Sequence, residues 1–162
     1  MNEIEKLTSQ HAGNPESYAR SYLNYIKTCL DSVDCKMISE FVELLLKARR
    51  NENTVFFIGN GGSAATASHF ANDIAIGTQT GEGKPFKALS LTDNTSIITA
   101  LANDQGYDRI FIDQLKIHLT KGDSVVAISA SGNSPNIISA VTYAKSRGAT
   151  IVGLTGFDGG KL

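Results

Sequence analysis

The spacing of apolar positions changes near residue 54, and this change divides the chain into two stretches. In residues 14–50 apolar side chains recur every three or four positions, which is the spacing of amphipathic helices. Asn14 followed by Pro15 predicts the start of a first helix, because asparagine caps helices and proline is tolerated at the first helical position. We therefore expect residues 1–53 to form a unit built on a helical hairpin.

The second helix of this hairpin is predicted to carry an unusually wide apolar band. The band consists of Met37, Ile38, Phe41, Val42, Leu44, Leu45 and Leu46. Part of it must cover the core of the domain. The excess predicts an interface between subunits, and hence an oligomer.

From residue 54 onward, short apolar runs alternate with helical patterns. Strands are predicted at residues 54–58, 86–91, 124–128 and 150–154, and helices at about residues 64–76, 96–102, 107–119 and 135–147. This alternation is typical of an α/β fold with a parallel sheet covered by helices on both faces, which makes three layers. Such sheets bind ligands at the carboxyl ends of their strands. We therefore expect residues 54–162 to form one ligand-binding domain.

Composition and charge give no support for a nucleic acid or a membrane as the partner of this protein. The 162 residues are 41% hydrophobic and 19% charged, as in a folded domain. A formal net charge of -1 gives no electrostatic reason to bind nucleic acid or an anionic membrane. No apolar run reaches the roughly 20 residues of a membrane span, and the N-terminus lacks an apolar signal core. Cys29 and Cys35 match no zinc spacing, so we expect reduced thiols and a cytoplasmic location.

Two predicted strand ends carry loops suited to an anion. Residues 59–63 (GNGGS) follow the first strand, but lack both the third glycine of the dinucleotide pattern and the lysine of a nucleotide triphosphate loop. Residues 129–134 (SASGNS) bring three hydroxyl groups to the turn before Pro135, with Ser134 as the predicted helix cap. Backbone N–H groups and the helix dipole at such a turn favour phosphate. The alternative is an ordinary hydrophilic turn with a capping serine.

His69 and Asp73 form a second candidate group. They lie four residues apart in a predicted helix, so they are neighbours on one face. Three interpretations remain open: a solvated polar face, half of a metal site, or an acid–base pair beside a bound sugar phosphate. The short distance along the chain from the glycine loop favours the last two.

Taken together, these motifs resemble those of the phosphoheptose isomerases, which belong to the sugar-isomerase (SIS) domain superfamily. The matching segments are residues 59–65, 69–71, 102–104, 129–136, 154–156 and 158–161. The resemblance implies a flavodoxin-like α/β fold, an N-terminal helical pair and a homotetramer. It also implies an aldose–ketose isomerase that converts sedoheptulose 7-phosphate to D-glycero-D-manno-heptose 7-phosphate, a step of carbohydrate metabolism in lipopolysaccharide biosynthesis.

The resemblance also implies site residues. Those expected to bind substrate are Asn60, Gly61, Gly62, Ser63, Asp73, Asn103, Asp104, Ser129, Ala130, Ser131 and Ser134. His69 would be a ligand of a zinc ion. Asp73 stands where the family has a glutamate that acts as catalytic base and metal ligand. Since the ordinary pKa values of the two carboxyls differ by only about 0.4, the substitution changes the reach of the group more than its acidity.

The family's pattern continues with a helix whose glutamine and histidine complete the metal site and supply the catalytic acid. We expect these groups beyond Leu162, and the 162-residue form alone to be inactive or nearly so. Two other functions compete with the isomerase. One is a non-catalytic SIS adaptor, such as a replication-initiator-associating protein, and Gly62 together with residues 131–134 favours the isomerase over it. The other is a phosphosugar-sensing regulatory domain, which usually accompanies a DNA-binding module that is not evident here.

Overall fold

The computed structural model describes residues 3–79, 81 and 83–162, and the chain divides into two compact units. The units are Met1–Glu40 and Phe41–Leu162. Helices α1 (Glu3–Gln10) and α2 (Pro15–Asp31) belong to the first unit, and α3 (Cys35–Arg50) runs through the boundary. The last part of α3 belongs to the second unit because its apolar side chains pack into that unit's core.

The first unit begins with a helix that the sequence pattern does not predict. The turn after α1 is joined to α2 by a hydrogen bond of 2.8 Å between His11 Nδ1 and Ser17 Oγ. The predicted start of α2 is confirmed, since Asn14 Oδ1 accepts the N–H of Ser17 at 3.0 Å and Pro15 is the first helical residue. Side-chain capping of this kind satisfies an N–H that the helix itself leaves without a partner.

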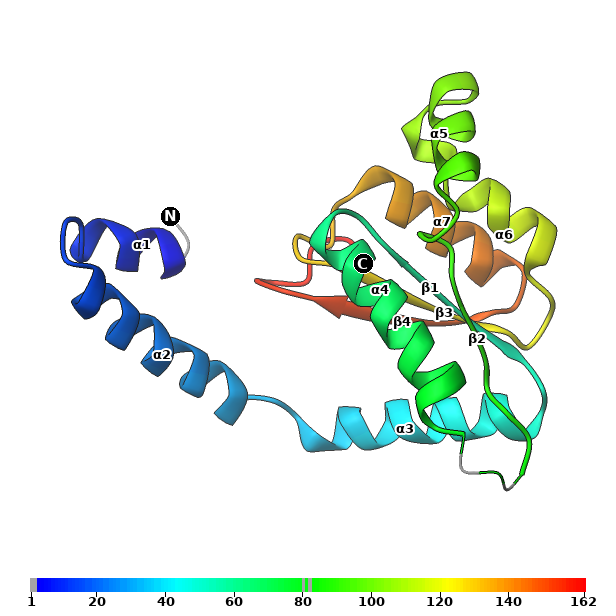
Figure 1. Cartoon of the computed structure of the whole chain (residues 1–162), viewed down its shortest axis with the longest axis horizontal. Helices are drawn as coiled ribbons and strands as arrows, with labels where there is room; N and C mark the ends of the chain where they lie inside the picture. Colours follow the sequence, from blue (N-terminus) through cyan, green and yellow to red (C-terminus); the bar gives the residue numbers. More distant parts are fainter. Residues whose placement is uncertain (1–2, 80, 82) are drawn as a thin grey trace. The chain divides into compact units, whose positions relative to one another are not determined.

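The second unit is built on a parallel four-stranded sheet (Figure 1), as the sequence predicts. The strands are β1 (Thr54–Gly59), β2 (Lys87–Ser90), β3 (Ser124–Ser129) and β4 (Thr150–Thr155). Their order is β2-β1-β3-β4, and every neighbouring pair is parallel. The carboxyl ends of all four strands therefore lie at one edge of the sheet, together with the loops that follow them.

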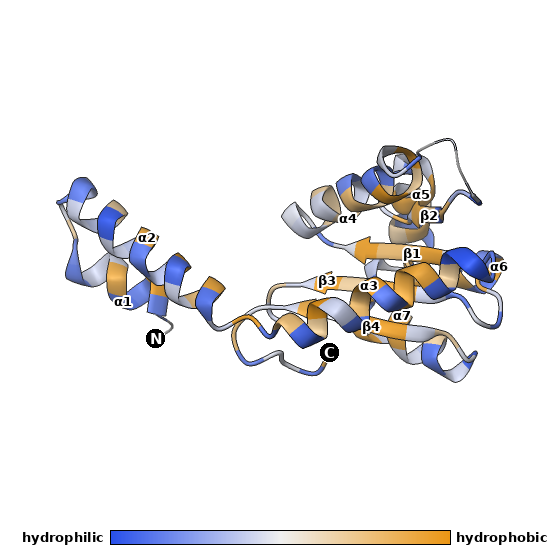
Figure 2. Cartoon of the chain, turned by 90° about the horizontal axis from the view of Figure 1, so that it is seen from below, coloured by the Kyte–Doolittle hydropathy of each residue, from blue (hydrophilic) through white to orange (hydrophobic). Residues whose placement is uncertain are grey.

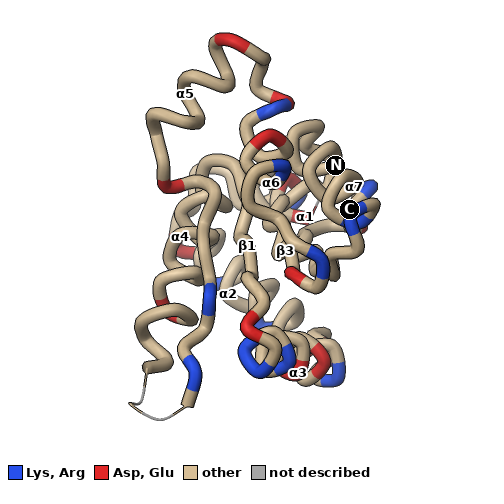
Figure 3. Tube along the Cα trace, turned by 90° about the vertical axis from the view of Figure 1, so that its right-hand side faces the viewer, with Lys and Arg blue, Asp and Glu red and all other residues tan. Residues whose placement is uncertain are grey.

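Helices α3 and α4 (Gly62–Asn72) cover one face of this sheet. Val55 and Phe57 of β1 are fully buried there, and the Phe70 ring of α4 stacks on Phe57 with centroids 5.4 Å apart. Acidic and basic residues both occur along α3 (Figure 3), and its last turn carries the basic residues Lys47, Arg49 and Arg50.

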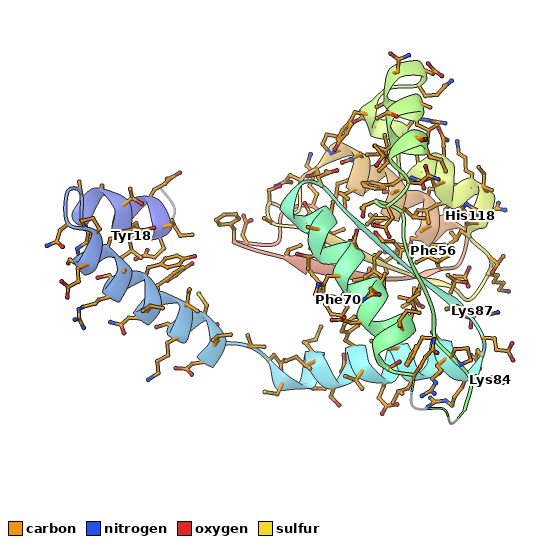
Figure 4. All side chains as sticks on the ribbon, in the orientation of Figure 1. Tyr18, Phe56, Phe70, Lys84, Lys87 and His118 are labelled. Carbon is orange, nitrogen blue, oxygen red and sulfur yellow. The ribbon has the colours of Figure 1, made fainter. Side chains whose placement is uncertain are left out.

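The other face is covered by α5 (Thr95–Asp104), α6 (Ile112–His118) and α7 (Pro135–Ser146). Phe56 and Ile58 point to this face, because successive side chains of a strand alternate between its two sides. Phe56 and Phe70 thus belong to opposite cores (Figure 4), and the strands between the helices are largely apolar (Figure 2). The three-layer α/β prediction is confirmed.

Two predicted helices differ from the observed ones. The helix predicted for residues 64–76 begins two residues earlier, as α4, and its last turn is a π-helix, Asp73–Gly77. The helix predicted for residues 107–119 is split into a 3₁₀ turn, Tyr107–Arg109, and α6. Between them lie Ile110 and Phe111, both only 1% exposed. Adjacent residues of a regular helix point about 100° apart, and the break accompanies the burial of both side chains.

The wide apolar band predicted on α3 divides between two environments. Phe41 and Leu45 pack against the core between α4 and the sheet, whereas Met37, Ile38 and Val42 stay exposed. In the described part of the chain, no helix combines the length and the apolar character that crossing a membrane requires.

Candidate active site

The loop after β1 is shaped by glycines. A Cβ on Gly59 would lie 2.5 Å from the carbonyl oxygen of Ser63, and Gly61 adopts a φ of +55° that favours glycine. The turn is closed by the Ser63 N–H, which donates to the carbonyl oxygen of Asn60 at 2.9 Å. Gly62 and Ser63 already belong to the first turn of α4. Asn60 is therefore presented at the carboxyl edge of the sheet by a tight strand-to-helix turn.

Asn60 is held by a network that the sequence does not predict. Its Nδ2 donates to Oδ1 of Asn136 at 2.9 Å, and Nδ2 of Asn136 donates back to Asn60 Oδ1 at 2.8 Å. The hydroxyl of Tyr107 donates to the same Asn60 oxygen at 3.0 Å. Asn136 is 1% exposed and lies in the first turn of α7. The network ties the loop after β1 to the loop after β3.

The serine-rich turn, residues 129–134, gathers hydroxyl groups at the start of α7. Ser129 is buried at the end of β3, and its Oγ lies 3.4 Å from Oγ of Ser134. The hydroxyl of Ser131 accepts the N–H of Asn133 at 3.2 Å. Ser134 is the residue before Pro135 at the helix start, as predicted. It is the N-cap residue, as predicted, but its side chain makes no capping hydrogen bond, and its hydroxyl lies near that of Ser129.

The segment after β4 packs against the serine-rich turn. The N–H groups of Lys161 and Leu162 donate to the carbonyl oxygen of Gly132 at 3.0 and 3.1 Å. Gly156 N–H donates to the Ala130 carbonyl oxygen at 2.9 Å. Gly132 has a φ of +62°, and a Cβ there would lie 1.8 Å from the carbonyl oxygen of Gly159. Only glycine permits this close approach of two loops.

His69 and Asp73 lie together on α4 and at the start of the π-turn. His69 Nε2 is 3.1 Å from Asp73 Oδ2, and the two side chains are 77% and 60% exposed. They line an open groove of about 450 Å³ whose other residues are Ala65, Thr66, Phe70 and Ile74. The predicted helical adjacency is confirmed. The described contacts do not connect this pair to the serine-rich turn.

Asn103 and Asp104 end α5, and both are exposed. Asn103 Nδ2 donates to Asp104 Oδ1 at 2.7 Å. Three residues further along the chain, Tyr107 makes its hydrogen bond to Asn60. The end of α5 therefore lies just before the turn that carries Tyr107.

A further polar cluster, which the sequence pattern does not predict, lies at the end of β2. Ser68 Oγ of α4 lies 2.9 Å from Thr92 Oγ1, and it also donates to the carboxylate of Asp93. Thr92 Oγ1 is in turn 2.6 Å from the hydroxyl of Ser90. This cluster fastens the end of β2 to α4, which carries His69.

A zinc ion fits the described residues only in part. Imidazole and carboxylate are both zinc ligands, and His69 and Asp73 are close enough to share an ion. Within residues 3–79, 81 and 83–162, however, no third histidine, cysteine, aspartate or glutamate joins them. Zinc sites use three or four protein ligands. The described residues do not by themselves form a zinc site.

Comparison with known protein families first shows which class of domain this chain forms. The SIS domain family matches residues 17–156, which is most of the chain. The fold and the strand-end loops are thus those of a SIS domain.

More closely, the chain belongs to the phosphoheptose isomerase family. It is 39% identical over 142 residues to the phosphoheptose isomerase of Rhodospirillum rubrum, and the match covers 83% of this chain and 75% of that protein. It is 42% identical over 120 residues to the one of Aliarcobacter butzleri, covering 74% of this chain and 63% of that protein.

Solved structures agree with this assignment. The phosphoheptose isomerase of Neisseria gonorrhoeae superposes with a TM-score of 0.79 at 37% identity, covering 90% of this chain and 77% of that one. That of Francisella tularensis superposes with a TM-score of 0.80 at 27% identity, covering 99% of this chain and 78% of that one.

Proposed function

We propose that this protein is an aldose–ketose isomerase that interconverts sedoheptulose 7-phosphate and D-glycero-D-manno-heptose 7-phosphate. The observation that carries the proposal is the Asn60–Asn136 pair, which joins the two anion-type loops at the carboxyl edge of the sheet. This is where a parallel α/β sheet binds its ligand. Membership in the phosphoheptose isomerase family favours this reaction over a non-catalytic adaptor or a phosphosugar sensor.

The serine-rich turn is the proposed phosphate site. The hydroxyls of Ser129, Ser131 and Ser134 lie at a turn that opens α7, a helix of 12 residues. The N–H groups of a first helical turn and the positive end of the helix dipole attract an anion. Binding the phosphate far from the reacting carbons would use that binding energy to hold C1 and C2 in place.

The proposed reaction passes through an enediol. Starting from the ketose, a base takes a proton from C1 while an acid protonates the C2 carbonyl oxygen. The proton then returns to C2 as the C1 hydroxyl loses its own, which leaves the aldehyde. We assign the base to Asp73, whose carboxylate lies in the groove of α4 with His69 beside it. Asn103 and Asp104 are proposed as further substrate contacts.

The base assignment is tested with the full-length protein in heavy water. We expect the parent to incorporate deuterium into the sugar during turnover, and Asp73→Asn to lower the rate by about 10²- to 10⁴-fold, the usual effect of losing one acid–base group. Asp73→Glu should keep activity or improve it, because it retains the carboxylate. NMR of the product measures the rate of turnover and the rate of deuterium incorporation.

Asp31→Asn at the exposed end of α2 is the matched control, and it should turn over like the parent. An Asp73→Asn variant that exchanges deuterium at the parent rate would remove Asp73 from the reaction. It would leave the pair on α4 as a solvated polar face.

The phosphate assignment has its own test. Ser131→Ala should weaken binding of sedoheptulose 7-phosphate about 10- to 150-fold by calorimetry, the range for one hydrogen bond to a charged group. Its melting temperature should change little, since Ser131 is exposed. Unchanged affinity would place the phosphate elsewhere.

A further inference from the structure

We infer that Asn136 and Tyr107 are positioning residues, which fix the Asn60 amide so that it offers the substrate an N–H donor and no acceptor. The inference deepens the proposed function and rests on Asn60 facing the sugar phosphate. Its basis is the set of hydrogen bonds among these three side chains.

The orientation of Asn136 is set by the backbone. Its Oδ1 accepts the N–H of Ile137 at 3.0 Å, so this atom must be the oxygen, because an amide nitrogen there would face another donor. Asn136 is 1% exposed, which removes water as a substitute partner. Its Nδ2 must then point toward Asn60, where it donates at 2.8 Å.

The orientation of Asn60 follows from that of Asn136. The atom of Asn60 that receives the Asn136 N–H must be the oxygen, and the atom that donates to Asn136 Oδ1 at 2.9 Å must be the nitrogen. The two amides thus form a closed pair with one permitted arrangement. The N–H of Ile137 thus fixes the orientation of Asn136, and Asn136 fixes that of Asn60 in the proposed site.

Tyr107 completes the arrangement. An amide oxygen has two lone pairs, and Asn60 Oδ1 uses them for Asn136 Nδ2 and for the Tyr107 hydroxyl at 3.0 Å. The amide nitrogen has two N–H groups, and the hydrogen bonds among the described residues use one of them. The group that Asn60 retains for a ligand is therefore an N–H.

An N–H at this position favours a ligand that places a hydrogen-bond acceptor against Asn60. A phosphate, carbonyl or hydroxyl oxygen of a sugar phosphate accepts such a bond, whereas a group with only donors, such as a protonated amine, does not. If the amide were free to turn, its oxygen would face the ligand part of the time, and a phosphate oxygen would meet a repulsive partner. The network removes that state in advance of binding, which lowers the cost of association.

The test is a double-mutant cycle on substrate affinity in the full-length protein. Tyr107→Phe removes one hydroxyl from a half-exposed ring, so the variant keeps its packing. We expect it to weaken binding of sedoheptulose 7-phosphate about fivefold by calorimetry, the effect of one neutral hydrogen bond. In an Asn60→Ala background the same change should have no effect, because the amide that Tyr107 orients is gone.

Tyr143→Phe is the matched control. Tyr143 is a tyrosine of α7 that packs against the core on the same face of the sheet and takes no part in the network. The Tyr143→Phe variant should bind sedoheptulose 7-phosphate with the affinity of the parent. A Tyr107→Phe effect of equal size in both backgrounds, or no effect in the parent background, would overturn the inference.

A second measurement separates this inference from the proposed function. In the ligand-free protein, one Nδ2 proton of Asn60 should exchange slowly and the other fast by NMR, and Tyr107→Phe should shift both resonances. If the parent binds no sedoheptulose 7-phosphate but shows this pattern, the proposed function fails and the fixed amide stands. Equal, fast exchange of both protons would overturn the fixed amide whatever the protein binds.

Discussion

At the scale of single residues, the site depends on close approaches that only particular side chains allow. Gly132 is the clearest case, since a Cβ would lie 1.8 Å from the carbonyl oxygen of Gly159 and the φ of +62° already disfavours other residues. The polar side chains follow the same principle. Asn60 and Asn136 fit one another because each offers one donor and one acceptor in a plane.

Gly132→Ala should therefore damage the proposed phosphate site and the segment after β4 together. The variant must move the backbone around Gly159, so we expect a loss of more than about 2 kcal/mol in the free energy of unfolding, beyond the roughly 1 kcal/mol for a left-handed alanine. Gly148→Ala is the control, because its φ of +83° is also positive but the added Cβ would make only an ordinary contact, 3.7 Å from Cγ of Lys121. Denaturant unfolding compares the two. Equal losses would show that the loops adjust freely.

At the scale of elements, helix ends and helix-surface pairs decide local stability. The π-turn at the end of α4 starts at Asp73, so the candidate base is also the residue at which the regular helix ends. On α6, Asp113 receives hydrogen bonds from Arg109 Nε at 2.9 Å and from Lys116 Nζ at 2.9 Å. This cluster joins the 3₁₀ turn to the helix after it.

The charge of Asp113 makes this joint sensitive to acid. Burial raises the pKa of its carboxyl, but the hydrogen bonds from Arg109 and Lys116 outweigh burial and bring the pKa below its ordinary 3.8. A lowered pKa in the folded state stabilises the protein above the unfolded pKa, and that contribution is lost as the pH falls through the folded pKa.

Asp113→Asn should accordingly lower the melting temperature at pH 7, and the difference from the parent should shrink as the pH falls below about 4. Glu16→Gln is the control, because its ion pair with Arg20 is exposed on both sides and contributes little. Thermal unfolding followed by circular dichroism across this range measures the difference. A difference in melting temperature that does not depend on pH would show that Asp113 acts through packing and not through its charge.

At the scale of the whole molecule, the chain exposes more apolar side chains on α2 and α3 than a monomer needs. Those exposed on these two helices are Leu23, Ile26, Leu30, Met37, Ile38 and Val42. Apolar surface of this kind marks sites of protein association. We propose that these helices form the interface of a homotetramer.

A charged pair of substitutions tests this interface. Leu23→Glu combined with Leu30→Glu should reduce the mass measured by light scattering at micromolar concentration, because both leucines are about two thirds exposed in the single chain. Ile117→Glu on α6 is the control, since Ile117 is 77% exposed but lies on another helix. A parent protein that is already monomeric would contradict the proposal.

Much of the fold follows from local patterns along the chain. The strand–helix alternation predicts the parallel sheet, because each strand must reach its neighbour through a covering helix. Asn14 and Pro15 predict the start of α2 through capping chemistry confined to one turn. His69 and Asp73 are predicted as neighbours by helical geometry alone, and they lie 3.1 Å apart. In each case the interacting groups are close in sequence.

Only the tertiary structure decides which distant groups meet. Asn60 and Asn136 are 76 positions apart, and Asn60 and Tyr107 are 47 apart, so no periodicity connects them. Their pairing results from the order of the strands, which brings the loops after β1 and β3 to one edge. The position of the Ser134 hydroxyl, 3.4 Å from that of Ser129, is likewise visible only in the folded chain. The sequence by itself determines the elements and the chemical groups at their ends, whereas packing of the sheet determines how those groups orient one another.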